Sequence, residues 1–302
     1  MVSYNMSQEE KTFLEQYDIT KYERPSIATD VAIFSIMNEG ENKNFRKLEK
    51  KALKILLIKR ADYPYKDCWA LPGGFCRPNE DIYDTARREL YEETNVKEAF
   101  IKAAGVYGEI GRDPRGWIIS NTFLALMDSR KCELQAGTDA GEAKWFAVEL
   151  EKREIKRETE EDAIYIETEY VLHFLHQEDK TSFSVKIVEH KEFKNYHESL
   201  KYEILEKGNL GFDHGKIILQ TLLGLRKDVE NDARIVFDLM PELFTLTQLQ
   251  NAFEILLDEE LFKANFRRKI ASYVIETDKS IEGAGHRPAK LFKRNIEAFY
   301  RE

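Results

Sequence analysis

Three glutamates, Glu89, Glu92 and Glu93, are the strongest candidates for chemistry in this 302-residue sequence. On an α-helix, residues three and four apart share a face, so these side chains would project together. Like charges at that spacing repel one another, and a hard divalent cation such as Mg²⁺ or Mn²⁺ relieves the repulsion because it accepts carboxylate oxygens readily. A solvated acidic helix face is the alternative explanation for the same spacing.

The residues around the three glutamates favour a binding site. Arg88 is adjacent to them, and Glu80 stands eight residues earlier, where it can pair with Arg88 and brace a loop against the helix. Gly73 and Gly74 allow the backbone to approach a ligand closely or to adopt positive φ. Together these residues predict a loop and a helix that grip a metal-bound phosphate.

This stretch resembles the signature of the Nudix hydrolase family, GX5EX7REUXEEXGU, where U is an aliphatic residue. Eight of the nine specified positions match: Gly74, Glu80, Arg88, Glu89, Leu90, Glu92, Glu93 and Val96. The departure is Asn95, which stands where the family has glycine. Asparagine is the commonest non-glycine residue in the left-handed conformation that often ends a helix, so we expect the exchange to cost little.

The resemblance implies an α+β fold, a mixed sheet sandwiched between helices. It also implies metal-dependent hydrolysis of a nucleoside diphosphate linked to another moiety, with Mg²⁺ or Mn²⁺ neutralising charge and activating water. By the same resemblance the three glutamates are metal ligands, one of which can assist as base, while Glu80 and Arg88 are structural. In some relatives a later carboxylate participates, and here Asp139 and Glu142 are both candidates.

The segment GRDPRG, residues 111–116, is the second informative stretch. Arg112 and Arg115 flank a turn, and two guanidinium groups on one loop suit a phosphate. A surface loop whose arginines pair with nearby acids is the alternative. After a Nudix signature, the segment resembles the loop of Nudix proteins that handle ADP-ribose, so ADP-ribose is the favoured ligand. Four aromatic residues are candidates for an adenine platform: Phe34, Tyr63, Tyr65 and Trp117.

Apolar patterning predicts the elements that position these residues. The predicted strands are Asp30–Met37, Leu53–Ile58, Ala103–Glu109, Trp117–Met127 and Ala143–Val148, whereas Trp69–Phe75 leads through Pro72-Gly73-Gly74 into a loop. The predicted helices are residues 8–16, Ile82–Thr94 and His214–Arg226, the last capped by Asp213. Residues 150–210 read as an insertion, with helices expected over Tyr165–Gln177 and Lys201–Glu206. The charged stretch 226–234 predicts a domain boundary.

The last forty residues carry ten basic and five acidic residues, whereas the whole chain has a net charge of −9. Such asymmetry indicates a module that faces a polyanion. Three helices are expected, over Asp232–Leu239, a segment capped by Thr247, and Lys263–Ile275, followed by two strands around a glycine-rich tip. This order predicts a winged helix, in which the third helix reads the major groove.

The sequences NFRRKI and GHRPAKLF also resemble the C-terminal domain of Nudix-related transcriptional regulators. The resemblance implies binding of double-stranded DNA, with five candidate contacts: Arg267, Arg268, Lys269, Arg287 and Lys290. It also implies a homodimer, since a winged helix gains affinity when paired on DNA. A helical module used only for dimer contacts is the alternative, because fold does not fix function.

Composition limits the remaining possibilities. The net charge argues against nucleic-acid affinity over the whole surface. Three cysteines are too few for a disulfide framework, and neither a secretory signal nor a membrane-spanning apolar run is visible, so we expect a cytoplasmic protein. The predicted organisation is an N-terminal arm over 1–20, a Nudix domain over 21–227 and a winged-helix domain over 228–302. The complete acidic set favours hydrolysis as the primary function with DNA binding added; an ADP-ribose-sensing regulator with little or no hydrolysis is the alternative.

Overall fold

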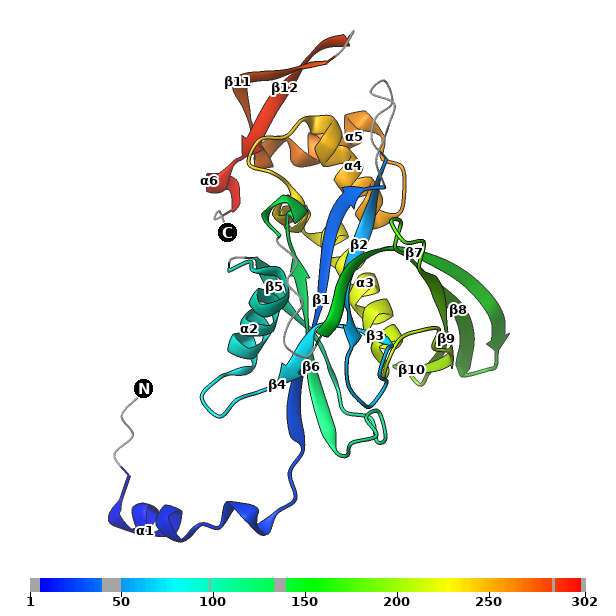
Figure 1. Ribbon diagram of the computed structural model, residues 1–302. Helices are drawn as coiled ribbons and strands as arrows, with labels where there is room; N and C mark the ends of the chain where they lie inside the picture. The colour runs from blue at the N-terminus through cyan, green and yellow to red at the C-terminus, as the bar shows by residue number, and fades with distance from the viewer. Residues whose placement is uncertain (1–5, 40–49, 98, 133–139, 284–285, 300–302) are drawn as a thin grey trace.

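The computed structural model describes residues 6–39, 50–97, 99–132, 140–283 and 286–299. Within them one mixed sheet has the order β10-β9-β8-β7-β2-β1-β6-β5 (Figure 1). Its Nudix part consists of β1 (Ser26–Asn38), β2 (Lys51–Arg60), β5 (Phe100–Tyr107), β6 (Ile118–Leu126) and the start of β7 (Ala140–Thr159). The short strands β3 (Trp69–Ala70) and β4 (Gly73–Phe75) pair with β2 and β1. Strand β1 is parallel to β6 and antiparallel to β2, so the sheet is mixed as expected.

Helices cover both faces of this sheet, which confirms the predicted α/β/α sandwich. Successive residues of a strand point to opposite faces. Ile33 accordingly packs with Leu90 of α2 (Ile82–Thr94), whereas the adjacent Phe34 packs with Leu222 of α3 (His214–Asn231). All four side chains are essentially inaccessible to solvent.

Residues 150–210 form strands, so the helices predicted there are wrong. After its pairing with β2, strand β7 continues into a meander of β8 (Ala163–Leu175), β9 (Ser182–Lys194) and β10 (His197–Glu206). Burial along β8 alternates with period two over its second half, which marks a strand with one covered face. The half-buried positions between the buried ones mix Glu169 and His173 with the apolar Val171, and this mixture obscured the alternation.

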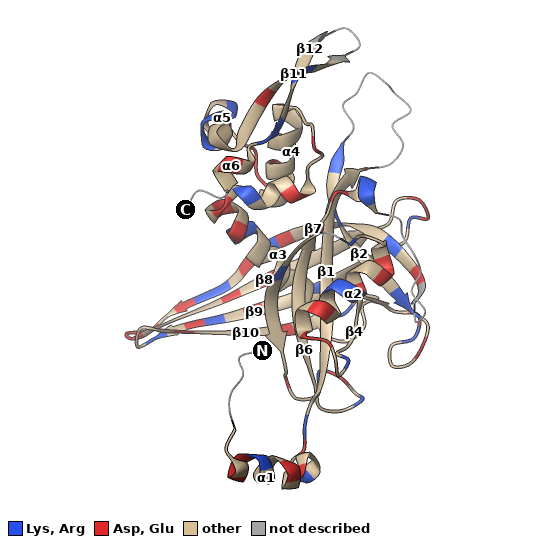
Figure 2. Ribbon diagram, turned by 90° about the vertical axis from the view of Figure 1, so that its left-hand side faces the viewer, with Lys and Arg blue, Asp and Glu red and all other residues tan. Residues whose placement is uncertain are grey.

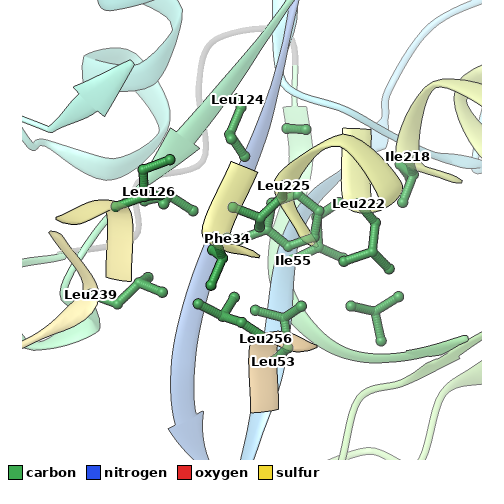
Figure 3. Packing of buried hydrophobic residues seen from close by; sticks show 14 of the residues in the cluster. Phe34, Leu53, Ile55, Leu124, Leu126, Ile218, Leu222, Leu225, Leu239 and Leu256 are labelled. Carbon is green, nitrogen blue, oxygen red and sulfur yellow. The ribbon is translucent and has the colours of Figure 1, made fainter. Parts of the chain in front are cut away.

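The C-terminal module is a winged helix that shares a core with the sheet. Its helices are α4 (Leu246–Leu257) and α5 (Lys263–Ile270), and its hairpin is β11 (Val274–Gly283) with β12 (His286–Arg294). Figure 3 shows Leu256 of α4 beside Leu53 and Ile55 of the sheet, with Leu225 of α3 nearby. The sheet, α3 and the winged helix therefore enclose one continuous apolar cluster.

Several predicted boundaries in this module were wrong. Thr245, and not Thr247, caps α4, through a reciprocal capping box with Gln248. The third helix ends at Ile270, since β-branched residues begin β11 at Val274. The first predicted helix is 3₁₀ helix η3 (Ala233–Leu239), and α6 (Ile296–Phe299) follows the hairpin. The remaining 3₁₀ turns are η1 (Ile19–Lys21), η2 (Ser129–Lys131) and η4 (Ala271–Tyr273).

The chain is helical at both ends of the Nudix part. The charged stretch 226–234 is no extended linker, because α3 runs through it to Asn231 and η3 starts at Ala233. The predicted N-terminal helix is α1 (Gln8–Gln16), which has no buried residue and projects away from the sheet (Figure 1). None of the helices among the described residues combines the length and apolarity needed to cross a bilayer.

Candidate functional site

The signature segment folds as a strand, a loop and a helix. Strand β4 leads through the loop to α2, where Asp81 and Asp84 form a reciprocal capping box. The helix ends at Asn95, which adopts the left-handed conformation (φ 57°, ψ 17°) and donates its N–H to the Tyr91 carbonyl at 2.8 Å. The left-handed asparagine expected from the sequence is therefore confirmed, and glycine is not required at this position.

Glu80 and Arg88 form the predicted brace. Arg88 Nε donates to Glu80 Oε1 at 2.8 Å, and its second terminal nitrogen donates to Glu80 Oε2 at 3.1 Å. Thr85 adds a hydroxyl donor to Glu80 at 3.1 Å. Hydrogen bonds from Arg88 hold the pKa of Glu80 below its ordinary value. A bidentate pair of this kind fixes both the loop and the arginine rotamer.

The three glutamates differ in exposure. Glu89 and Glu93 are buried, with 8% and 6% of their surface exposed, while 42% of the Glu92 side chain is exposed. Arg88 bridges two of them, since its Nη1 lies 2.6 Å from Glu89 and 3.4 Å from Glu92. Burial raises the pKa of Glu89, and the charge and hydrogen bond of Arg88 oppose that rise.

Gly74 leaves room for the Glu89 carboxylate. A Cβ on Gly74 would overlap Glu89 Oε1, and a Cβ on Gly73 would overlap the Thr29 carbonyl and approach Asp30 Oδ1. The two glycines thus let β4 pass between two buried carboxylates. This close approach is a physical reason for the glycine pair that does not depend on family resemblance.

A hard divalent cation fits the chemistry of this donor set, which consists of carboxylate oxygens held on one helix face. Within the part of the chain that the structure describes, however, the side chains do not converge as three or more metal-ligating groups. Arg88 instead supplies the positive charge next to Glu89 and Glu92. Of the two later carboxylates, Asp139 lies outside the described residues, while Glu142 on β7 pairs with Lys144 at 2.5 Å.

The two loop arginines have different environments. Arg115 pairs with Asp113 at 2.7 Å, has 40% of its side chain exposed, and lies between the rings of Phe75 and Phe212, with its Cζ 5.2 Å and 5.4 Å from their centroids. Arg112 is almost wholly buried and pairs with both carboxylate oxygens of Asp213. As the side chains lie, only Arg115 of the two presents a guanidinium group to solvent beside the signature loop.

A buried polar cluster behind the loop was missed by sequence reasoning. His214 Nδ1 accepts the Leu71 N–H at 2.9 Å, so its other ring nitrogen carries the proton and lies 3.6 Å from Asp30. Burial lowers the pKa of His214, which favours this neutral form. Ser120 donates to Asp30, and Arg112 lies 3.9 Å from the same carboxylate. The part of the sequence that belongs to this cluster is the polar segment Asp213–Lys216, which begins α3. The structure buries the whole segment.

The aromatic candidates also separate by exposure. Phe34 is completely buried in the core, which excludes it as a ligand platform. Tyr63 and Trp117 are 82% and 57% exposed, and Tyr65 packs edge-on against Phe212 at 4.8 Å between centroids. Phe212 and Phe75, which hold the Arg115 guanidinium, were not among the candidates.

The basic residues of the winged helix gather on α5 and the hairpin (Figure 2). Arg267, Arg268 and Lys269 are exposed on α5, whose buried face consists of Phe266 and Ile270. On β12, Lys290 is exposed and pairs with Glu276 at 2.7 Å. The side chain of Arg287 lies outside the described residues.

Comparison with known proteins supports both parts of the chain. The NUDIX domain model matches residues 31–168, and the model of the NrtR DNA-binding winged helix domain matches residues 236–293. The "ADPR responsive transcriptional repressor NtrR" of Acinetobacter baylyi is 30% identical over 293 residues, which cover 96% of this chain and 90% of the relative. An "ADP-ribose pyrophosphatase" of Methanocaldococcus jannaschii is 38% identical over 139 residues, 45% of this chain and 72% of the relative.

Two solved structures share the whole fold. A MutT/nudix family protein from Enterococcus faecalis superposes with a TM-score of 0.64 at 24% identity, covering 96% of this chain and 94% of the other. Shewanella oneidensis NrtR complexed with a 27mer DNA gives a TM-score of 0.56 at 22% identity, with coverage of 90% and 94%. The chain therefore belongs to the family of Nudix proteins that carry an NrtR-type C-terminal winged helix domain.

Proposed function

We propose that this protein is a DNA-binding transcriptional repressor whose Nudix domain binds ADP-ribose. The observation that carries the proposal is similarity over nearly the whole chain to an ADP-ribose-responsive repressor, with both domains in the same order. This reverses the priority expected from the acidic signature alone, because a full-length relative outweighs one that covers only the Nudix part.

The exposed basic side of α5 supports the DNA-binding half of the proposal. Three consecutive basic residues, Arg267, Arg268 and Lys269, face solvent, and lysines of the hairpin extend the positive charge. Contacts between such basic side chains and DNA phosphates supply much of the affinity of a DNA-binding module, and contacts of the reading helix with base edges supply specificity. We further propose that the protein acts in the cytoplasm as a homodimer, because two linked winged helices bind adjacent half-sites more tightly than one.

The loop around Arg115 supports the ligand half. Its guanidinium lies over the rings of Phe212 and Phe75, and Phe75 is the residue that follows Gly74 of the signature. A planar, partly exposed guanidinium suits bidentate recognition of a phosphate oxygen pair. The diphosphate of ADP-ribose would lie between this loop and the glutamates of α2.

Hydrolysis of ADP-ribose to AMP and ribose 5-phosphate is the second candidate function, which the complete set of glutamates favours. In that reaction Glu89, Glu92 and Glu93 would hold Mg²⁺ or Mn²⁺, which supplies charge neutralisation and an activated water. Glu80 fixes Arg88, and Arg88 in turn holds Glu89 in place through its Nη1. Gly74 leaves the space that the Glu89 carboxylate occupies.

One pair of assays tests these functions separately. DNA fragments from the source genome would be retained on the full-length protein at low salt, and the retained fragment titrated with and without ADP-ribose. No retained DNA would refute the repressor proposal. Turnover of ADP-ribose with Mg²⁺ would be measured on wild type, Glu92→Gln and Asn95→Gly; turnover lost in the first variant and kept in the second supports hydrolysis. No turnover in wild type would remove this second function only.

A further inference from the structure

The candidate ligand loop is tied to the first turn of α3 by two ion pairs. Arg112 donates to Asp213 Oδ1 at 2.7 Å and to Oδ2 at 3.0 Å, and only 5% and 10% of the two side chains are exposed. Glu109 and Lys216 pair at 2.6 Å, with the Lys216 side chain 5% exposed. The loop that carries Arg115 therefore holds the start of α3 through one buried pair and through a second pair whose Glu109 side chain is 72% exposed.

The other end of α3 is fixed to the winged helix. Arg226 donates to Asp258 at 3.1 Å and to the Leu256 carbonyl at 3.2 Å, and both acceptors lie at the C-terminal end of α4. Leu222 and Leu225 of α3 belong to the apolar cluster that also contains Leu256 (Figure 3). A displacement of α3 would thus be transmitted directly to α4.

Two ion pairs lie in series here: Arg115 pairs with Asp113 on the loop, and Arg112, which directly precedes Asp113 in the chain, pairs with Asp213 at the start of α3. Asp113 is only 4% exposed, and Arg115 satisfies both of its oxygens, at 3.0 Å and 2.7 Å. Burial alone would raise the pKa of Asp113, but hydrogen bonds and charge from Arg115, together with the charge of Arg112, hold that pKa below its ordinary value. Arg115 is therefore the partner of this buried carboxylate, and the neighbouring Arg112 is paired with Asp213.

We propose that this series is the joint through which ligand binding in the Nudix domain alters DNA binding by the winged helix. The inference rests on the proposed ADP-ribose and DNA-binding functions. A ligand phosphate that takes the Arg115 guanidinium leaves Asp113 buried without its main partner, which is costly. Asp113 then shifts toward solvent, and because Arg112 directly precedes it in the chain, the same shift draws Arg112 away from Asp213 and releases the first turn of α3. DNA affinity falls because α3 no longer fixes α4 in one position.

The decisive experiment uses the full-length protein and the DNA fragment that wild type retains. We expect saturating ADP-ribose to weaken DNA binding of wild type by about tenfold, within the usual range of allosteric coupling. In Asp213→Asn the joint is already open, so ADP-ribose should change DNA affinity by less than about twofold. The variant should bind ADP-ribose at least as tightly as wild type, because no energy is spent on opening; a merely structural defect would weaken that binding.

Asp179→Asn is the matched control, since it removes a carboxylate that pairs with Lys144 away from α3, and it should respond as wild type does. An equal response in Asp213→Asn and wild type would overturn the joint alone. No response in wild type, or no DNA binding, would overturn the proposed function and the joint with it.

Hydrogen exchange on wild type gives a reading that needs no variant. The amides of Lys216 and Ile217 donate to the Asp213 carbonyl at 2.9 Å and 3.2 Å in the first turn of α3. ADP-ribose should accelerate exchange in the peptide that contains them, because the turn loses its anchor. Exchange that stays constant or slows on ligand binding would contradict the proposed release.

Discussion

Leu256→Ala tests whether the two domains form one cooperative unit. Leu256 lies in α4 of the winged helix, has no exposed surface, and packs in the cluster that contains Leu53, Ile55 and Leu225. Replacement of a fully buried leucine by alanine costs about 3 kcal/mol, because apolar contacts are lost and a cavity remains. With a urea dependence of about 3 kcal/mol/M, the unfolding midpoint should fall by about 1 M.

Tryptophan fluorescence makes the assay selective for the Nudix part. The three tryptophans, Trp69, Trp117 and Trp145, all precede α3, whereas Leu256 follows it. The fluorescence midpoint should fall with the far-UV circular dichroism midpoint, although the substitution is in the other domain. Leu205→Ala is the control, because Leu205 is 50% exposed on β10 and its loss should change stability by no more than about 0.5 kcal/mol.

Separate transitions would refute this reasoning. If Leu256→Ala lowers only an early circular dichroism transition and leaves the tryptophan midpoint unchanged, the winged helix is thermodynamically independent of the sheet. The continuous core would then not couple the domains, and a displacement of α3 would not reach α4.

Three further predictions concern the site and the DNA interface. Gly74→Ala should abolish Mg²⁺-dependent turnover or metal binding, because the added Cβ overlaps Glu89 Oε1 and displaces that carboxylate. Gly224→Ala on α3 is the control: its added Cβ meets nothing within 4 Å, so turnover and metal binding should stay unchanged and the helix should be stabilised by up to about 1 kcal/mol. Enzyme assay, metal titration and thermal melting distinguish the two variants. Asp113 has a pKa below its ordinary value, so its contribution to stability is complete above about pH 4 and is lost as the pH falls toward that lower pKa. As the pH is lowered from 6 to 3, the melting temperature should therefore decline less steeply in Asp113→Asn than in wild type. An identical dependence of melting temperature on pH in both proteins would contradict a lowered pKa of Asp113. Arg268→Ala should weaken DNA binding at every sequence and reduce the slope of log affinity against log salt by about one, whereas an unchanged slope would place Arg268 away from phosphate.

The local part of the fold could be predicted from the sequence. The span of α2 was predicted from its apolar patterning, and Asn95 was expected to be left-handed because its neighbours end a helix. The Glu80–Arg88 pair also depends only on residues eight apart. In these cases the determining contacts lie within one loop and helix, so local rules are sufficient.

The rest depends on contacts between distant residues. Tyr165–Gln177 was assigned to a helix because its strand character appears only when β7 and β9 pair on either side. The pairing of Arg112 with Asp213 joins residues 101 positions apart, and His214 reaches Leu71 across 143 positions. Arg112 was predicted to bind a ligand because no neighbouring residue indicates that Asp213, at the start of α3, is its partner.

The most direct test of the central claim is the DNA affinity of the full-length protein with and without ADP-ribose, measured at low and at moderate salt. We predict retention of a specific fragment from the source genome and an affinity that ADP-ribose lowers by about tenfold. Absence of DNA binding even at low salt, or an affinity that saturating ADP-ribose leaves unchanged, would contradict the claim that this protein is an ADP-ribose-responsive repressor.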